Sequence, residues 1–215
     1  INRNRILLNN KDAILTLSLK RRSHYDDILQ FEIWLQEAVD AQVNEPIACC
    51  LSTVSKYGQP SSRIVYIRNI TDKGFVLFTN YTSKKGRDIE QNPKVCVNFF
   101  WPELERQIRI EGIIEKVEES VSDEYFKDRP RSSQIGAWSS NQSEVIPNRE
   151  ALNKAIEDVE KKFEGKDVTR PPHWGGYIIV PNLIEFWQGR KSRLHDRLVY
   201  LQTEANTWVV ERLNP

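Results

Sequence analysis

The chain has 215 residues and a mass of 25.2 kDa, enough for one domain with a sizeable core or for two small ones. Its 31 basic and 30 acidic side chains leave a formal net charge of +1, so it lacks the basic excess typical of nucleic-acid and membrane-surface proteins. No run approaches the roughly 18 apolar residues of a transmembrane helix. We therefore expect a globular protein with neither a nucleic-acid nor a membrane partner.

The cysteines and the first residues indicate a reducing compartment. Cys49 and Cys50 are adjacent and Cys96 is isolated, without an even number or a CxxC spacing, so we expect buried thiols rather than disulfides. No apolar leader follows the basic residues near the start, which argues against secretion. We expect a cytoplasmic protein. The chain contains no Met and begins at Ile1, which suggests that the numbering starts after a missing N-terminal stretch.

The first 25 residues have no clear periodicity, and we interpret them as an N-terminal arm before a single domain over residues 26–215. Helices are predicted over 28–39, over 83–91, from a capping box of Ser120 and Asp123 to about 130, and from the N-cap Asn148 to about 163. Short strands are predicted at 47–55, 62–70, 75–79, 95–100, 107–117, 177–180, 183–188, 193–201 and 208–213. This order predicts a mainly β, barrel-like domain with peripheral helices.

Several common catalytic and nucleotide-binding motifs are missing. The chain has neither GxGxxG nor GxxxxGK[ST], so nothing supports a Rossmann or P-loop site. His24, His173 and His195 are scattered, without HExxH or a cysteine pair at metal spacing, so we expect no metal site. No GxSxG occurs, and Cys49 and Cys50 lie in an apolar run that favours inert thiols over a nucleophile.

The most informative segment is Glu185-Phe-Trp-Gln-Gly-Arg-Lys-Ser-Arg-Leu-His-Asp-Arg197. In the predicted strand that follows Gly189, one face would carry Arg193, His195 and Arg197. The opposite face, directed to a core, would carry Leu194, Leu198 and Tyr200. Cationic groups this close repel one another, so their face is either solvated or receives an anion. The neighbouring aromatic pair, Phe186 and Trp187, favours a site for a flat anionic ligand.

Two further segments fit phosphate binding but also have ordinary explanations. Residues 79–86 follow a predicted strand and open a helix, so Lys84, Lys85 and the helix amides could hold a phosphate. Serine and lysine are nevertheless common at helix starts. Tyr125 and Arg129 lie four residues apart and Ser133 follows shortly after them, which fits a phosphate and an ordinary surface helix equally well.

Polar residues also alternate on two predicted strands. Arg63 and Arg68 stand near the two ends of an apolar strand and on opposite faces, where arginines are most often edge anchors. Gln107, Arg109 and Glu111 share one face of another strand. A solvated surface is the simpler interpretation of that face.

Taken together, these segments resemble the pyridoxamine 5′-phosphate oxidase family. The most specific match is Glu185-Phe-Trp-Gln-Gly-x4-Leu-His-Asp-Arg197, which is similar to the family's C-terminal signature. Residues 129–138 (RPRSSQIGAW) and 104–107 (LERQ) support it. The resemblance extends from about Phe31 to Pro215, most of the chain.

The resemblance implies an FMN-binding split β-barrel that forms a homodimer with FMN at the subunit interface. It implies a flavoprotein oxidoreductase of pyridoxine biosynthesis that oxidises pyridoxamine or pyridoxine 5′-phosphate to pyridoxal 5′-phosphate, with O2 as electron acceptor. The implied cofactor contacts are Arg63, Ile64, Val65, Tyr66, Ile67, Arg68, Phe78, Thr79, Lys84, Lys85, Gln107, Gln142, Ser143, Trp187 and Arg197. The implied substrate contacts are Arg68, Tyr125, Arg129, Ser133, Arg193, Leu194 and His195.

The chain departs from the family pattern at three places. Arg68 stands where the family usually has lysine, and Lys84 stands where it usually has arginine. Both replacements keep the charge but change the donor geometry. An Arg-Arg-Glu-Tyr-like element that covers the substrate in relatives has no clear counterpart; residues 11–14 are the nearest alignment, and that role is not transferred.

The chemistry of such an enzyme fits the residues. A flavin carries out the hydride transfer, so the protein must bind and orient it. The cofactor and the substrate each carry a phosphate, which requires two cationic clusters. One comprises Arg63, Lys84 and Lys85; the other comprises Arg68, Tyr125, Arg129 and Ser133. Arg193 and His195 then remain as catalytic residues that face the substrate ring, chiefly to orient it, and His195 is able to relay a proton.

Two other functions remain open. A non-catalytic flavin-binding protein on the same barrel would keep the cofactor contacts without needing the substrate residues. A nucleic-acid or protein interaction module would use basic residues 20–22 and the six tryptophans. That module would be colourless when purified and would bind polyanions with a steep salt dependence.

Overall fold

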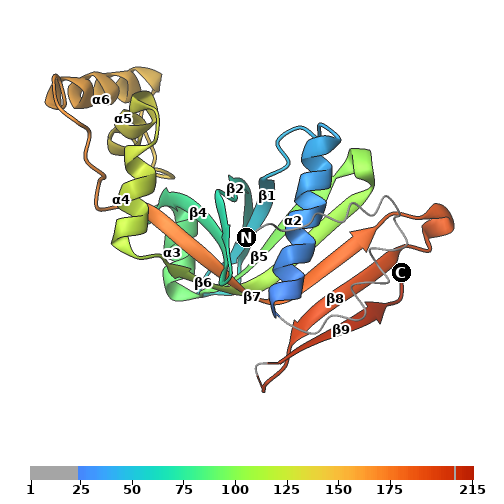
Figure 1. Ribbon diagram of the computed structural model, residues 1–215. Helices are drawn as coiled ribbons and strands as arrows, with labels where there is room; N and C mark the ends of the chain where they lie inside the picture. The colour runs from blue at the N-terminus through green and yellow to red at the C-terminus, as the bar shows by residue number, and fades with distance from the viewer. Residues whose placement is uncertain (1–23, 206) are drawn as a thin grey trace. The chain divides into compact units, whose positions relative to one another are not determined.

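The computed structural model describes residues 24–205 and 207–215 (Figure 1). Residues 11–14, basic residues 20–22 and most of the predicted arm lie outside them. The chain falls into two compact units. One comprises the described residues up to Ile47, Asn98–Glu111 and Pro181–Pro215, and the other comprises Ala48–Val97 and Gly112–Val180. The single domain over 26–215 stays a prediction.

Within the described residues, nine strands form one sheet in the order β2-β1-β5-β6-β7-β4-β3, with β8 beside β7 and β9 beside β8. The strands are β1 (Ala48–Val54), β2 (Pro60–Tyr66), β3 (Asn69–Thr71), β4 (Gly74–Asn80), β5 (Lys94–Trp101), β6 (Arg106–Lys116), β7 (Trp174–Gln188), β8 (Asp196–Gln202) and β9 (Trp208–Leu213). The helices are α2 (His24–Asp40), α3 (Lys84–Gln91), α4 (Glu119–Lys127), α5 (Arg131–Ser139) and α6 (Arg149–Lys162), with short 3-10 turns at η1 (Pro102–Leu104) and η2 (Lys191–Arg193). The prediction of a mainly β fold with helices is confirmed.

Aromatic side chains form the core of the first unit. Phe31 of α2 meets Phe99 of β5 edge-on at 5.1 Å between ring centres, and Trp34 meets Phe186 of β7 at 5.2 Å. Tyr200 of β8 packs against the same Phe186 at 5.7 Å. Burying each such ring contributes roughly 1.5–3 kcal/mol, so these contacts hold α2 on the sheet of its unit.

The predicted strand at 193–201 begins only at Asp196. Strands β7 and β8 pair antiparallel from Gln188 opposite Asp196 onward, so the residues between them form the connecting loop. Ser192 and Arg193 have φ of +58° and +61° there, and Leu194 is 69% exposed rather than directed to a core. The expected alternation of residues 193, 195 and 197 on one strand face is therefore wrong. Leu198 and Tyr200, inside β8, are buried as expected.

The second unit carries the β1–β2 hairpin, β4 and the remaining helices. Helix α3 begins after Ser83, whose hydroxyl accepts a hydrogen bond from the Gly86 amide. A Cβ at Gly86 would lie 1.8 Å from the Tyr81 carbonyl oxygen, so only glycine permits this close approach. A second apolar cluster joins α4, α5 and β7, and it consists of Phe126, Ile135, Phe163, Val168 and Trp174.

Several element boundaries differ from the predictions. Helix α4 begins at Glu119 without a side-chain cap, so the predicted capping box of Ser120 and Asp123 is wrong; Asp123 pairs with Arg170 instead. The segment 62–70 breaks into β2 and β3, and β7 runs without interruption through Pro181. Helix α5 was not predicted. The cap at Asn148 is confirmed, since its side chain accepts from the Ala151 amide at 2.9 Å.

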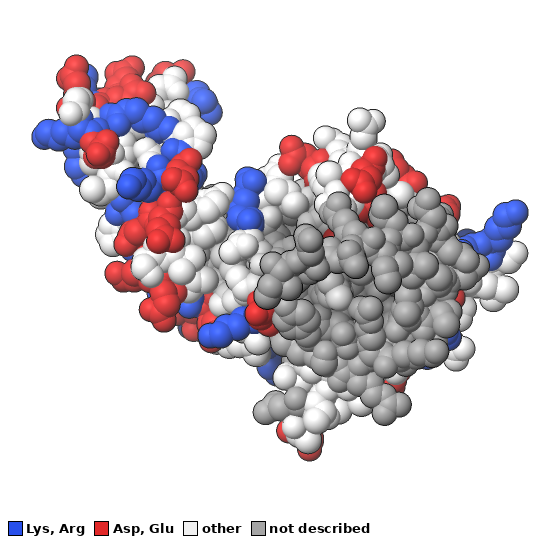
Figure 2. Space-filling view, in the orientation of Figure 1, with Lys and Arg blue, Asp and Glu red and all other residues white. Residues whose placement is uncertain are grey.

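Charges of both signs intermix over the surface of α4, α5 and α6 (Figure 2). In the part of the chain that the structure describes, no helix combines the length and the apolar character needed to cross a membrane.

Candidate functional site

A cavity of about 780 Å³ lies in the second unit, between β2, β4, α3, α4 and α5. The predicted cofactor residues that line it are Ile64, Val65, Tyr66, Arg68, Phe78, Thr79, Lys85 and Gln142. The predicted substrate residues that line it are Arg68, Tyr125, Arg129 and Ser133. The structure thus places members of both predicted phosphate clusters around one cavity.

Arg129 brings a buried cation to this cavity. Its guanidinium carbon lies 4.5 Å from the centre of the Trp174 ring and 5.6 Å from that of Phe126. Its Nη1 is buried and has no hydrogen-bond partner among the described residues. Burial lowers the pKa of Arg129, and the positive charge of Arg68 lowers it further. A buried guanidinium with a free donor is suited to an anionic ligand.

Three aromatic rings form a wall beside Arg129. Phe78 and Tyr125 stack with ring centres 3.8 Å apart and planes 3° from parallel. Trp174 lies nearly parallel to Phe78, with 5.7 Å between their centres. Because the stack fixes the ring of Tyr125, it also fixes the direction of its hydroxyl along the cavity wall.

Lys85 lies on the α3 side of the cavity. Its Nζ donates to Gln142 Oε1 at 2.7 Å, to Thr79 Oγ1 at 3.0 Å and to Ser83 Oγ at 3.2 Å. Burial and the nearby charge of Arg63 lower the pKa of Lys85 to about 8. All these partners are neutral, so Lys85 is a buried cation that no carboxylate of the described residues pairs with.

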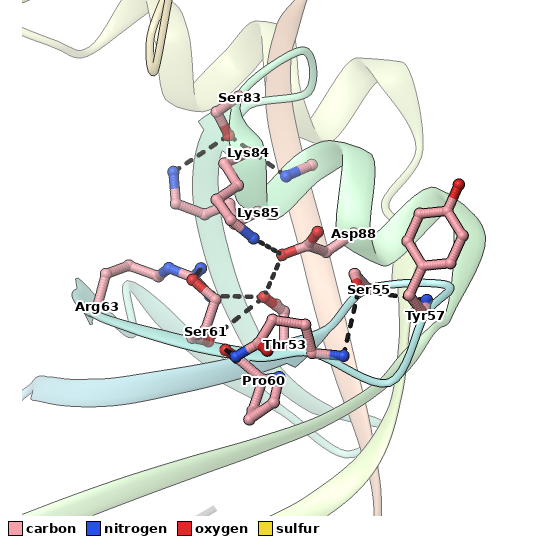
Figure 3. Close-up of polar contacts among 12 residues, drawn as sticks. Thr53, Ser55, Tyr57, Pro60, Ser61, Arg63, Ser83, Lys84, Lys85 and Asp88 are labelled. Atoms are coloured by element: carbon pink, nitrogen blue, oxygen red, sulfur yellow. Dashed lines mark hydrogen bonds and ion pairs between the residues drawn. The ribbon is translucent and has the colours of Figure 1, made fainter.

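Arg63 and Lys84 belong to a polar network beside Lys85 (Figure 3). Arg63 donates to Thr53 Oγ1 at 2.8 Å, and Lys84 Nζ donates to Asp88 Oδ2 at 2.9 Å. The predicted cofactor cluster of Arg63, Lys84 and Lys85 is therefore gathered on β2 and the first turn of α3. Of the other predicted cofactor residues, Ile67 is buried, and Ser143 is exposed with φ +75°.

The remaining predicted residues lie in the first unit. His195 is half-buried, with its ring centre 4.6 Å from that of Trp187, and its Nδ1 accepts a hydrogen bond from the Arg190 amide at 3.1 Å. This bond fixes Nδ1 as an acceptor, so the proton of the neutral ring lies on Nε2. Arg193 and Leu194 are exposed.

Arg197 is held by a buried carboxylate. Glu185, 2% exposed, accepts from Arg197 Nε at 2.6 Å and from Arg109 Nη2 at 2.7 Å. Burial raises the pKa of the Glu185 carboxyl, but hydrogen bonds from Arg197 and Arg109 and their charges outweigh it, so its pKa lies below its ordinary value. Gln107 shares the half-exposed face of β6 with Arg109 and Glu111, and these last two form an ion pair.

Sequence reasoning missed four residues that shape these sites. Trp174 supports Arg129, and Gly136 of α5 lines the cavity with no heavy atom within 4 Å of a Cβ built on it. Asp88 anchors Lys84, a cation of the predicted cofactor-phosphate cluster, and Glu185 anchors Arg197, a predicted cofactor contact. Asp88 left a signal in its position four residues after Lys84 on a helix, and Glu185 and Gly136 lie inside the motifs at 185–197 and 129–138, but none of the three was given a role.

The cysteines take no part in these sites. Cys49 is buried, and burial, with the neighbouring Cys50 and Cys96, raises the pKa of its thiol to about 12. Such a thiol is a poor nucleophile. Over residues 24–205 and 207–215, no group of three or more His, Cys, Asp or Glu side chains is arranged to hold a metal ion.

Comparison with known sequences places the chain in a family. A family model described as pyridoxamine 5′-phosphate oxidase matches residues 35–163, and one described as the pyridoxine 5′-phosphate oxidase C-terminal dimerisation region matches residues 174–215. The chain belongs to the pyridoxamine 5′-phosphate oxidase family. This confirms the resemblance that the C-terminal signature and residues 129–138 suggested.

Relatives in this family span nearly the whole chain. A pyridoxine/pyridoxamine 5′-phosphate oxidase of Neisseria meningitidis is 54% identical over 188 residues, covering 87% of this chain and 89% of the relative. One of Acaryochloris marina is 48% identical over 197 residues, covering 92% and 90%.

Solved structures support the fold. PhzG from Burkholderia lata 383, in complex with tetrahydrophenazine-1-carboxylic acid, is 33% identical with a TM-score of 0.83, covering 87% of this chain and 92% of PhzG. A pyridoxamine 5′-phosphate oxidase-related, FMN binding protein from Nostoc punctiforme is 15% identical with a TM-score of 0.65, covering 98% and 100%. The predicted split β-barrel of the pyridoxamine 5′-phosphate oxidase family is confirmed.

Proposed function

We propose that this protein is an FMN-dependent oxidase of pyridoxamine and pyridoxine 5′-phosphate. Its family, and the 54% identity to a relative named for this activity, support the proposal. The observation that carries it is the unpartnered, buried Nη1 of Arg129 in a cavity that also holds Lys85. A cavity with separate cationic positions fits two phosphate esters better than one.

The residues present fit FMN. A phosphate monoester carries a charge of about −1.5 to −2 at neutral pH, and Arg63, Lys84 and Lys85 offer a compact cationic cluster for it. Strand β2 ends the sheet order, so one edge of its backbone is left without a neighbouring strand among the described residues. Residues 64–66 of this strand line the cavity. Their backbone amides and carbonyls would pair with the polar edge of the flavin ring.

A second group of residues would hold the substrate phosphate. Arg68, Tyr125, Arg129 and Ser133 line the same cavity, and they supply two guanidinium groups and two hydroxyls. Guanidinium groups bind phosphate oxygens through two parallel hydrogen bonds, which orients the ester as well as neutralising it. Arg68 retains this ability although the family usually has lysine there.

Arg193 and His195 are the proposed catalytic residues. FMN, when bound, would supply the two-electron acceptor for oxidation of the substrate carbon, with O2 as the final oxidant, reduced to H2O2. Arg193 would hold the substrate ring, and the Nε2 proton of His195 would bond a polar substituent of that ring. Gln107, Gln142, Ser143, Trp187 and Arg197 are proposed as further cofactor contacts.

The protein is proposed to act as a homodimer with FMN at the subunit interface. The match of residues 174–215 to a dimerisation region supports the dimer. Sedimentation of the purified protein tests it: a monomer at micromolar concentration would contradict it. A cytoplasmic location, in agreement with three free cysteines, belongs to the same proposal.

An absorbance spectrum of the purified protein tests the function. We expect flavin bands that bleach when pyridoxamine 5′-phosphate is added without oxygen, and that return on exposure to air. Flavin bands that persist with the substrate would indicate a non-catalytic flavin-binding protein. A colourless protein that does not take up added FMN would contradict the proposal altogether.

A further inference from the structure

Arg63 is anchored by three oxygen atoms of the β1–β2 hairpin, and Figure 3 shows it beside two of the residues that supply them, Thr53 and Ser61. Its Nη1 donates to the Leu51 carbonyl at 3.2 Å and to Thr53 Oγ1 at 2.8 Å, and its Nη2 donates to Ser61 Oγ at 2.8 Å. A guanidinium has five N–H donors. Three are used here, so the Nε donor and one Nη2 donor remain for a ligand.

The hairpin register brings these atoms together. Leu51 lies opposite Arg63 and Thr53 lies opposite Ser61, so Arg63 reaches Thr53 diagonally across the strand pair. The turn is closed by Ser55, whose hydroxyl accepts from the amides of Tyr57 and Gln59. The position of the guanidinium is therefore set by backbone pairing as well as by its own contacts.

Thr53 links Arg63 to a carboxylate on another element. Its side chain is fully buried, and its Oγ1 lies 2.8 Å from Asp88 Oδ2 on α3. An ionised carboxylate only accepts hydrogen bonds, and Asp88 Oδ2 at 2.8 Å is nearer to the Thr53 hydroxyl than the Ser61 carbonyl oxygen at 3.4 Å, so the single hydroxyl proton of Thr53 points to Asp88. The lone pairs of Oγ1 then face Arg63. The chain of bonds has one direction, from Arg63 through Thr53 to Asp88.

Asp88 remains charged although it is only 6% exposed. Its Oδ2 also accepts from Lys84 Nζ, one helical turn earlier. Burial raises the pKa of the Asp88 carboxyl, but bonds from Lys84 and Thr53 and the charges of Lys84 and Arg63 outweigh burial, so its pKa lies below its ordinary value. One carboxylate thus holds Lys84 directly and Arg63 through Thr53.

The charges of this network match a phosphate monoester. Arg63, Lys84 and Lys85 carry three positive charges, and Asp88 carries one negative charge, which leaves +2. A phosphate monoester dianion carries −2. Without Asp88 the cations would be in excess and would repel one another in a partly buried setting.

We propose that Thr53 and Asp88 are positioning residues for the cofactor phosphate, because they fix Arg63 and Lys84 with their remaining donors free. This inference rests on the proposed binding of FMN. Neither residue needs to touch the cofactor. Their effect is transmitted by the direction of the Thr53 hydroxyl bond and by the negative charge of Asp88.

Binding of FMN and of riboflavin to the apoprotein, measured by quenching of flavin fluorescence, tests the proposal. Thr53→Val keeps the shape of the side chain but removes its hydroxyl, so we expect FMN to bind on the order of tenfold more weakly. Riboflavin lacks the phosphate, and its affinity should not change. Thr53→Ser, which restores the hydroxyl, should restore FMN affinity to within about threefold of the wild type.

Ser52→Ala is the matched control. Ser52 lies on the same strand, and its hydroxyl contacts Ser62 rather than Arg63. We expect this variant to bind FMN like the wild type. Circular dichroism checks that each variant folds.

Asp88→Asn gives a second test that does not depend on folding of the valine variant. Loss of the carboxylate should weaken FMN binding, although it makes the cluster more positive. Tighter FMN binding would show that Asp88 acts only as a charge and would overturn its positioning role. Equal losses of FMN and riboflavin affinity in Thr53→Val would overturn the role of Thr53. If the wild-type apoprotein binds no FMN, the proposed function itself fails.

Discussion

Arg129 and Trp174 form a cation–π pair, with the guanidinium carbon 4.5 Å from the indole ring centre. The pair holds the guanidinium against a flat surface and leaves its buried Nη1 without a protein partner among the described residues. A cation that is supported on one side and unpaired on the other is prepared for an anion. Trp174 therefore contributes to the site without being part of the predicted contact set.

Replacing Arg129 should weaken binding of the substrate phosphate. Arg129→Met removes a charged donor worth about 1.5–3 kcal/mol, so kcat/KM for pyridoxine 5′-phosphate should fall by roughly 10- to 150-fold, mainly through KM. Arg129→Lys should recover only part of the loss in kcat/KM. Lysine keeps the charge, but it can neither form two parallel hydrogen bonds to the phosphate nor stack on Trp174 as a guanidinium does. Steady-state kinetics measures both. If unphosphorylated pyridoxine loses as much in kcat/KM, Arg129 does not act on the phosphate.

Gly136 offers a way to fill the cavity without disturbing its walls. It lies inside α5, and a Cβ at this position meets no heavy atom within 4 Å. Gly136→Ala should stabilise the protein by about 0.5–1 kcal/mol, since alanine favours helix. Gly136→Leu should remain folded but weaken ligand binding, because its side chain enters the cavity. Thermal unfolding and flavin titration measure the two effects.

Gly165 provides the contrasting control for that substitution. It follows α6 with φ +67°, where a Cβ is unfavourable, so Gly165→Ala should destabilise by about 1 kcal/mol.

If Gly136→Leu binds FMN and substrate as tightly as the wild type, neither ligand uses the part of the cavity beside α5.

FMN affinity should fall as the pH rises through about 8. Burial, helped by the charge of Arg63, lowers the pKa of Lys85 to about 8, so the apoprotein loses this positive charge above that pH. The phosphate is already a dianion above pH 7, with a second pKa near 6, and does not titrate in this range. Fluorescence titration between pH 7 and pH 9.5 should show FMN affinity falling about tenfold.

Two comparisons isolate Lys85 as the cause. Arginine does not titrate in this pH range. The FMN affinity of the Lys85→Arg variant should therefore stay constant with pH, even if this variant binds FMN more weakly than the wild type. Riboflavin affinity should also stay constant. A pH-independent FMN affinity in the wild type would show that Lys85 does not sense the phosphate.

Glu185→Gln should destabilise the protein at neutral pH and much less in acid. Glu185 is a buried carboxylate between Arg109 and Arg197, whose side chains are each 30% exposed. Removing its charge should cost about 1–3 kcal/mol, a value reduced by the solvent around both arginines. The Glu185 pKa is lower in the folded state than in the unfolded state, so its contribution is present above the unfolded pKa and is lost as the pH falls.

Urea unfolding at pH 7 and at pH 3 measures this difference. The difference in unfolding free energy between Glu185→Gln and the wild type should narrow at the lower pH, because the carboxyl of the unfolded wild-type chain, with its ordinary pKa, is protonated there and the unfolded state is favoured. If the difference in unfolding free energy were equal at pH 7 and at pH 3, the loss of stability in Glu185→Gln would come from packing rather than from charge.

The strands and most helices could be predicted because their patterns are local. Strand β9 matches its predicted bounds, and Ser83 and Asn148 cap their helices as their residue types suggest. The loop before β8 was wrongly predicted as part of a strand, since Arg193, His195 and Arg197 alternate along the sequence as residues on one face of a strand do. Its conformation is set by the return of β8 onto β7, a non-local contact.

Site residues could be predicted where they belong to a family motif. They could not be predicted where they only support another side chain of the site. Tyr125, Arg129 and Ser133 line the cavity together with Arg68, which the resemblance had grouped with them. Trp174 lies 45 residues beyond Arg129 and reaches it only through the packing of β7 against α4 and α5. No spacing in the sequence reports such a contact.

His195 should act through its Nε2 atom. Its Nδ1 is occupied by the Arg190 amide at 3.1 Å, and its ring lies against Trp187, so Nε2 is the nitrogen left for substrate. Glutamine can place its amide nitrogen near the position of Nε2, whereas asparagine is too short. Turnover of pyridoxine 5′-phosphate should therefore fall about 10- to 100-fold in His195→Ala and His195→Asn, and less in His195→Gln.

Arg193→Ala tests the orienting role of Arg193. If Arg193 holds the substrate ring, its loss should lower kcat/KM at every pH without changing the shape of the pH profile, whereas loss of His195 removes a hydrogen-bond donor to the substrate. FMN content, read from the visible spectrum, should be normal in both variants. Unchanged turnover in Arg193→Ala and His195→Ala together would remove both residues from the catalytic site, because the cofactor and phosphate contacts alone would then account for the reaction.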